Sequence, residues 1–212
     1  MSRNDSFHTP TTEELLGLPI DRLVVATNVN DILHRALSEG DYSVGSVTPT
    51  AAPSMDIQVS SNFERLLFDL HGRDGAALAA SMKGFDASRK FALTPAMRAE
   101  AANLFTSARI DPESMEMAMR RANECSAMVL DPHSAIGYAA ALAADLPADV
   151  PVVTLATAHP AKFRDAVERA TGSRPLLPLR VGDLFDREER YEVLPNDLGA
   201  VQAYIAERAT TA

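Results

Sequence analysis

A polar residue followed by proline, directly after a short apolar run, recurs along this chain. Asp111–Pro112, Asp131–Pro132 and His159–Pro160 each precede a stretch with helical periodicity. Because Asp caps helix N-termini and Pro suits the first helical position, the Asp-Pro pairs mark helix starts, and Pro160 opens a helix in the same way. The short apolar runs before them are typical of buried strands. Strands alternating with helices predict an α/β fold with a mainly parallel sheet and helices on both faces.

The branched, apolar runs at 22–27 and 151–156 are the clearest predicted strands. "FTSARI" (105–110) and a short run around "YEVL" (191–194) are further candidates. Periodicity predicts helices over 29–38, 61–72, 75–85, 94–105, 111–124, 133–144, 160–170 and 197–208. The side chains expected in the core are Leu66, Leu67, Val152, Val153, Leu155 and Phe163.

Composition excludes several classes of protein. The chain has 212 residues, is 46% hydrophobic and carries a net charge of -9, with no basic cluster for nucleic acid or anionic membranes. It has one cysteine, Cys125, so no internal disulfide can form. No apolar run is long enough for a membrane span, and the N-terminus has no secretory h-region. A cytoplasmic, reducing setting fits best.

Polar side chains lie where predicted strands end, which is where open parallel sheets bind ligands. His133 and Ser134 open one helix, and Thr157 and His159 stand between the run at 151–156 and the next helix. Helix capping and ordinary strand chemistry are the competing explanations. A metal site built from Asp131, His133 and His159 lacks a further ligand at metal spacing, so it is disfavoured.

"ATNVND" places two amides and a carboxylate, Asn28, Asn30 and Asp31, at another strand end. These groups suit the polar head of an amino-acid substrate. Helix capping by Asn28 or Asn30 is equally consistent with the sequence. The following segment, 40–60, is rich in Gly, Pro, Ser and Thr and predicts a long irregular loop, a feature that is often functional.

Four motifs, in this order, resemble threonine synthase of the longer variety: "LVVATNVNDIL", "DPHSAIG", "LATAHPAKF" and "VLPNDLGAVQAYIAER". The resemblance runs from about Gly17 to the end of the chain. It implies a pyridoxal-phosphate (PLP) enzyme fold of the tryptophan-synthase-β type, of which this would be the C-terminal portion. It also implies a phospho-lyase that converts O-phosphohomoserine and water to L-threonine and phosphate.

The resemblance implies roles for particular residues. In that fold a Ser or Thr hydroxyl faces the pyridine nitrogen of PLP, and Thr157 matches this position. His133 and Ser134 match a wall of the cofactor site. "TPTAAPSMDI" (48–57) resembles a loop near the substrate, whose polar members here are Ser54 and Asp56. Together with Asn28, Asn30 and Asp31, they are the predicted substrate-binding residues.

The lysine that holds PLP covalently has no match among Lys83, Lys90 and Lys162, and no Gly-rich phosphate cup occurs in the chain. We therefore expect residues 1–16 to be a flexible leader unlike the family, and 17–212 to be the C-terminal portion of the enzyme. The isolated chain is expected to be inactive and to self-associate or bind the N-terminal half. Two alternatives are a non-catalytic binding module that kept the fold and an unrelated α/β ligand-binding domain.

Overall fold

Two parallel strands form the sheet in the part of the chain that the structure describes. The computed structural model describes residues 17, 19–147 and 149–209, and the predicted leader lies outside these residues. Strand β1 (Leu23–Thr27) pairs with β2 (Phe105–Arg109), with Leu23 opposite Phe105 and Thr27 opposite Arg109. The predicted parallel α/β class is confirmed, and so are the strands expected at 22–27 and 105–110.

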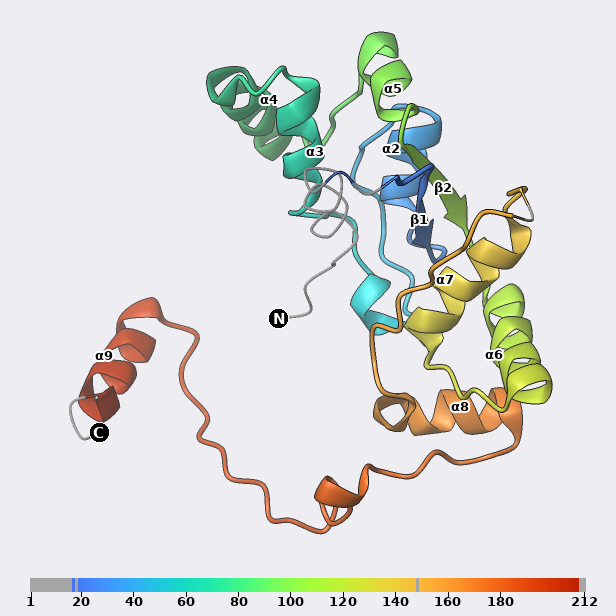
Figure 1. The fold of residues 1–212 in the computed structure, drawn as a ribbon. Helices are drawn as coiled ribbons and strands as arrows, with labels where there is room; N and C mark the ends of the chain where they lie inside the picture. Colours follow the sequence, from blue (N-terminus) through green and yellow to red (C-terminus); the bar gives the residue numbers. More distant parts are fainter. Residues whose placement is uncertain (1–16, 18, 148, 210–212) are drawn as a thin grey trace. The chain divides into compact units, whose positions relative to one another are not determined.

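Helices cover both faces of this sheet (Figure 1). Because side chains alternate along a strand, Val25 joins one core and its neighbours Val24 and Ala26 contact the other. The first core includes α2 (Ile32–Ser38) and α3 (Phe63–Leu70). The second core includes α6 (Pro112–Ser126), α7 (Pro132–Ala143) and α8 (Arg164–Thr171). The prediction of helices on both faces therefore holds.

The other elements described before Leu176 are α4 (Gly75–Ser88), α5 (Pro95–Ala101) and two short 3₁₀ helices, η2 (Pro53–Met55) and η3 (Pro160–Phe163). The polar residues before proline act as predicted. The side chains of Thr94, Asp111 and Asp131 accept hydrogen bonds from backbone N–H groups at the starts of α5, α6 and α7. Each cap satisfies donors that have no partner within the helix.

The prediction of a strand at 151–156 is wrong: these residues have no regular secondary structure. Val152, Val153 and Leu155, expected in the core, are 51%, 82% and 50% exposed. A strand needs a neighbouring strand for its backbone groups, and among the described residues β1 and β2 pair only with each other. Leu67 is buried as predicted, whereas Leu66 and Phe163 are half-buried.

Residues Leu176–Ala212 form a second compact unit. It contains the 3₁₀ helix η4 (Leu179–Val181) and helix α9 (Leu198–Ala209), which confirms the helix predicted over 197–208. Residues 191–194 form no strand, contrary to the prediction. As at 151–156, no neighbouring strand is present among the described residues. Throughout that described part of the chain, no helix has the length and apolar character needed to cross a bilayer.

Gly40 ends α2 in a conformation that disfavours other residues, with φ at +87°. A Cβ there would lie 2.8 Å from Cδ of Arg98 and 3.0 Å from the carbonyl oxygen of Leu93. We expect Gly40→Ala to lower the free energy of unfolding by ~2–3 kcal/mol, since backbone strain and a steric clash combine. Gly172→Ala is the control: φ is +74° but nothing lies within 4 Å, so strain alone should cost ~1 kcal/mol. If urea unfolding showed the same loss of stability for Gly40→Ala and Gly172→Ala, the steric clash at Gly40 would be contradicted.

Candidate functional site

The carboxylate of Asp131 organises the first turn of α7. It is fully buried and accepts hydrogen bonds from the backbone N–H groups of His133 (2.9 Å) and Ser134 (3.3 Å). It also accepts from Nδ1 of His133 (2.8 Å) and from the hydroxyl of Ser134. Burial by itself raises the pKa of Asp131, but these hydrogen bonds outweigh it and hold the pKa below its ordinary 3.8. The carboxylate is therefore ionised at neutral pH.

The His133 ring connects Asp131 to the loop that contains Ser54. The backbone N–H of Ser54 donates to Nε2 of His133 at 3.2 Å, so this nitrogen carries no proton. The proton of the neutral ring is then on Nδ1, which donates to Asp131. The ring of Phe163 lies against the imidazole, with 4.6 Å between the ring centroids. His133 is thus held on three sides.

Ser134 anchors the segment that contains Thr157. Its buried hydroxyl donates to Asp131 and accepts a hydrogen bond from the backbone N–H of Thr157 at 3.0 Å. The side chain of Thr157 is exposed, and within the described residues its hydroxyl has no hydrogen-bond partner. Two residues on, Nδ1 of His159 accepts from the N–H of Ala161 at 3.1 Å and caps η3. The structure therefore brings together Ser54, His133, Ser134 and Thr157.

A second polar cluster joins the end of β1 to the loop at 48–56. Nδ2 of Asn28 and Nδ2 of Asn30 both donate to Oδ1 of Asp56, at 2.7 and 3.0 Å. Asn28 also accepts from the N–H of Asn30, and Asn30 exchanges two hydrogen bonds with the backbone of Thr48. Both side-chain amides are buried and bind the loop, and that of Asn28 also binds the backbone of Asn30. Neither caps α2, whose N-cap residue is Asp31.

Asp31 lies outside this cluster and forms ion pairs instead. Its carboxylate oxygens lie 3.1 Å from Nε of Arg35 and 3.1 Å from Nε of Arg109. Sequence reasoning missed Thr50, whose hydroxyl donates to Asp56 at 2.7 Å and accepts from Asn28 at 3.0 Å. Its signal was the pairing of a hydroxyl with a carboxylate six residues later within one loop, which is too common a pattern to single out.

The cavity found beside the predicted site residues is small. A cavity at the end of β1, lined in part by Thr27, Asn30 and Met55, holds only about 20 Å³, room for about one water molecule. Small-molecule sites usually enclose roughly 300–1,000 Å³. Within the described part of the chain, no three His, Cys, Asp or Glu side chains converge as metal ligands.

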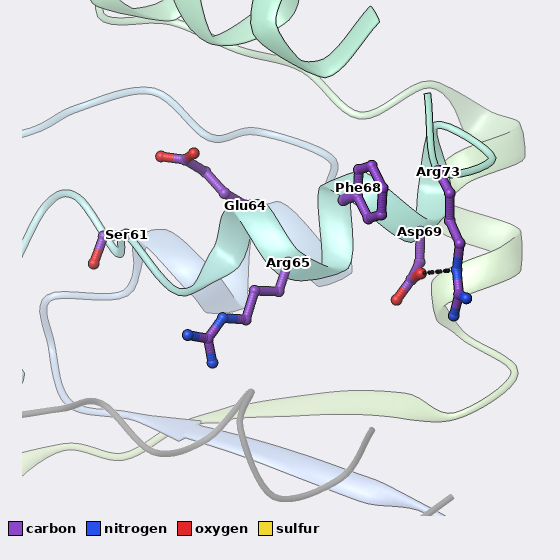
Figure 2. A pocket seen from close by; sticks show the side chains of 6 residues that line it. All are labelled: Ser61, Glu64, Arg65, Phe68, Asp69 and Arg73. Carbon is purple, nitrogen blue, oxygen red and sulfur yellow. Dashed lines mark hydrogen bonds and ion pairs between the residues drawn. The ribbon is translucent and has the colours of Figure 1, made fainter. Parts of the chain in front are cut away.

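A larger hollow, of about 460 Å³, lies along α3 and away from the predicted site residues (Figure 2). In Figure 2 it is lined by Ser61, Glu64, Arg65, Phe68, Asp69 and Arg73. Asp69 and Arg73 form an ion pair with 2.8 Å between Oδ1 and Nε. An open hollow with side chains of both charges favours no single ligand class, and we assign it no role.

Comparison with known proteins identifies the chain's relatives. A family model described as "Threonine synthase, C-terminal" matches residues 134–205. A threonine synthase from Pseudomonas aeruginosa is 49% identical over 193 residues, which are 91% of this chain and 41% of that protein. The crystal structure of PLP-bound threonine synthase from Brucella melitensis is 40% identical, with a TM-score of 0.88 over 98% of this chain and 44% of that one. The chain corresponds to the C-terminal portion of threonine synthase.

The match to threonine synthase extends across the fold but not across the whole enzyme. Yeast threonine synthase is 31% identical, with a TM-score of 0.84 over 96% of this chain and 45% of that structure. The chain thus spans about two-fifths of the length of the curated relatives it matches. The matched family model includes Ser134 and Thr157. The predicted relationship to threonine synthase is confirmed.

We predict that Asp131→Asn lowers the free energy of unfolding by about 1–3 kcal/mol at neutral pH. The amide NH₂ would face a buried N–H donor of His133 or Ser134 and leave it unsatisfied. Because the folded pKa is depressed, the stability supplied by the ionised carboxylate is present above pH ~4 and is lost as the pH falls through the folded pKa. The difference between wild type and variant should therefore shrink below pH ~4 in urea unfolding curves.

Asp111→Asn is the matched control. Asp111 also precedes a proline and caps a helix, but it is exposed and its carboxylate accepts only from Ser114, at 2.7 Å to the N–H. Asn caps helices about as well as Asp, so little change is expected. If both substitutions lowered the free energy of unfolding by the same amount, Asp131 would be an ordinary helix cap.

Proposed function

We propose that this chain supplies the C-terminal side of a threonine synthase active site. The reaction is the conversion of O-phosphohomoserine and water to L-threonine and phosphate with PLP, in a cytoplasmic setting. The identity to the Pseudomonas aeruginosa enzyme and the likeness to the PLP-bound Brucella melitensis structure support this proposal. The proposed activity, substrate and cofactor are those of a complete enzyme. This chain spans less than half the length of the Pseudomonas aeruginosa relative.

The placement of Thr157 carries the proposal. Its backbone N–H is fixed on Ser134, while its hydroxyl is exposed and has no partner among the described residues. A hydroxyl can donate to or accept from a ring nitrogen, so the residue fits the edge of a pyridine ring. When bound, PLP supplies an electron sink for the reacting substrate. A threonine hydroxyl is too weak an acid to protonate the ring nitrogen as a carboxylic acid would, so Thr157 keeps that sink mild.

The lysine that holds PLP is, in this proposal, supplied by the part of the enzyme that the chain does not match. Lys83 and Lys90 lie on and after α4, and Lys162 extends over the ring of Phe163, with 5.9 Å from Nζ to the ring centroid. All three are exposed, and none forms a hydrogen bond with Ser134 or Thr157 among the described residues.

We further propose that the loop at 48–56 faces the substrate. Asn28, Asn30 and Asp56 use their side chains to hold the loop, so their contribution to substrate binding is to fix its shape. Ser54 is exposed, and its hydroxyl is free to contact a polar substrate group. Asp31 and its two arginine partners lie at the same strand end as Asn28 and Asn30. The guanidinium group of Arg109 is suited to a phosphate.

The exposed segment around Val153 is proposed to receive the N-terminal portion of the enzyme. Val152, Val153 and Leu155 are apolar, exposed and without strand partners among the described residues. A strand from the unmatched portion would satisfy their backbone groups and cover their side chains. Without it, the same residues favour self-association of the chain.

We predict that the chain alone releases no phosphate from O-phosphohomoserine in the presence of PLP, and that adding the N-terminal portion of the Pseudomonas aeruginosa enzyme restores release. Absorbance of bound PLP and a phosphate assay measure the two steps. The control adds the same N-terminal portion without this chain. Phosphate release by the chain alone would show that one of its own lysines serves. Binding of the N-terminal portion without PLP absorbance or phosphate release would support a non-catalytic module.

We predict that Thr157→Val in the reconstituted enzyme lowers kcat by roughly ten- to a hundredfold. An unsatisfied ring nitrogen in a buried site costs ~1–3 kcal/mol, and ~1.4 kcal/mol corresponds to a factor of ten. The absorbance of bound PLP should shift, while the melting temperature should change little because valine replaces threonine with similar shape. Thr157→Ser keeps the hydroxyl and should retain most of the activity. A valine variant with normal turnover and an unshifted spectrum would remove Thr157 from the site.

A further inference from the structure

Ser54 and Thr157 are far apart in the sequence but are anchored to the same turn of α7. The N–H of Ser54 binds Nε2 of His133 at 3.2 Å, and Nδ1 of His133 binds Asp131 at 2.8 Å. From the other side, the N–H of Thr157 binds the hydroxyl of Ser134 at 3.0 Å, and that hydroxyl donates to Asp131. One carboxylate therefore connects the loop to the segment with the exposed hydroxyl.

The direction of each hydrogen bond between Ser54 and Thr157 along this connection is fixed. A backbone N–H can only donate, so His133 must accept through Nε2 and donate through Nδ1. The Ser134 hydroxyl has one proton, which Asp131 takes, so its lone pairs face the Thr157 N–H. The carboxylate only accepts while it is ionised, and its pKa is held low. Loss of the His133 ring therefore leaves the Ser54 N–H, and loss of the Ser134 hydroxyl leaves the Thr157 N–H, with no other acceptor among the described residues.

Water cannot easily replace the contacts of Asp131, because the groups around this carboxylate are buried. Asp131 is 0% and Ser134 is 2% exposed, and the side chain of His133 is 8% exposed. Phe163 covers the imidazole, so a displaced ring would also lose an aromatic contact. Buried, satisfied networks of this kind define one arrangement of the groups that they join.

We propose that His133 and Ser134 are positioning residues that couple the loop at Ser54 to the hydroxyl of Thr157 through Asp131. This inference rests on the proposed function, in which Ser54 faces the substrate and Thr157 faces the cofactor. Movement of the loop on substrate binding would then be transmitted to the hydroxyl at the cofactor edge. Neither His133 nor Ser134 needs to contact the cofactor or the substrate to have this effect.

Ser134→Ala tests the anchor of Thr157 in the chain itself, without cofactor. We expect hydrogen exchange of the Thr157 amide, followed by NMR, to become about tenfold faster, and that of the Ser54 amide to rise by a smaller factor. Ser126→Ala removes a hydroxyl that donates to the carbonyl of Ala122 from an exposed position at the end of α6, so it is the control and should change neither amide. An unchanged Thr157 amide in Ser134→Ala would overturn the positioning role.

Two substitutions of His133 separate the halves of the connection. Asn places an amide nitrogen near Nδ1, so His133→Asn keeps the bond to Asp131 and loses the acceptor for Ser54. Gln places its amide near Nε2, so His133→Gln keeps the acceptor and loses the bond to Asp131. Coupling predicts faster exchange at both Ser54 and Thr157 in each variant. If either variant changes Ser54 and leaves Thr157 at the wild-type rate, the two segments are independent and the proposal is overturned.

The reconstituted enzyme separates failure of this inference from failure of the proposed function. If Ser134 acts only through Thr157, Ser134→Ala should shift the absorbance of bound PLP in the same direction as Thr157→Val, and the double variant should shift no further. Additive shifts would overturn the positioning role while leaving the proposed function intact. Coupled exchange rates together with an unshifted spectrum in Thr157→Val would leave the coupling intact and overturn the proposed function.

Discussion

The buried carboxylate of Asp131 is the interaction on which the candidate site depends. An ionised carboxylate without partners would be very costly to bury, and four donors from the next three residues offset that cost. The N-terminal end of α7 adds a favourable dipole. Because two of these donors are the side chains of His133 and Ser134, satisfying the carboxylate also fixes both side chains. The orientation of the site thus follows from the cap of one helix.

This arrangement explains how Thr157 is placed without a strand. Residues 151–156 have no regular structure, so no ladder of backbone hydrogen bonds sets their position. Instead, Ser134 holds the N–H of Thr157, and two residues later His159 and Pro160 begin η3. The backbone at Thr157 is therefore held at its own N–H and again at the start of η3, two residues later. Gly137 of α7 leaves room for the side chain of Thr154. A Cβ at position 137 would lie only 3.3 Å from Cγ2 of Thr154.

Local signals were predictable from the sequence, and long-range ones were not. The caps Thr94, Asp111 and Asp131 and the helices after them depend on neighbouring residues, so their pattern was sufficient. The run at 151–156 has the same branched composition as β1, but a strand also requires a partner that composition does not reveal. Likewise, the sequence offered substrate binding or helix capping for Asn28 and Asn30, whereas the structure shows them holding the loop at Asp56. No local pattern distinguishes these outcomes.

The strand proposed to dock here would account for both the exposed valines and the exposed hydroxyl. Val153 and Thr157 lie on one irregular segment, and both are open to solvent. Docking of a strand along this segment would cover the valines and enclose the surroundings of Thr157 at the same time. Formation of the cofactor site would then be coupled to assembly of the enzyme. A neutral hydroxyl suits this sequence of events. It is stable in water before docking, and burying it costs far less than burying an unpaired carboxylate, whose desolvation would oppose assembly. In the proposed enzyme, Thr at position 157 would therefore suit the assembly of the site as well as the electronic demand of the cofactor ring.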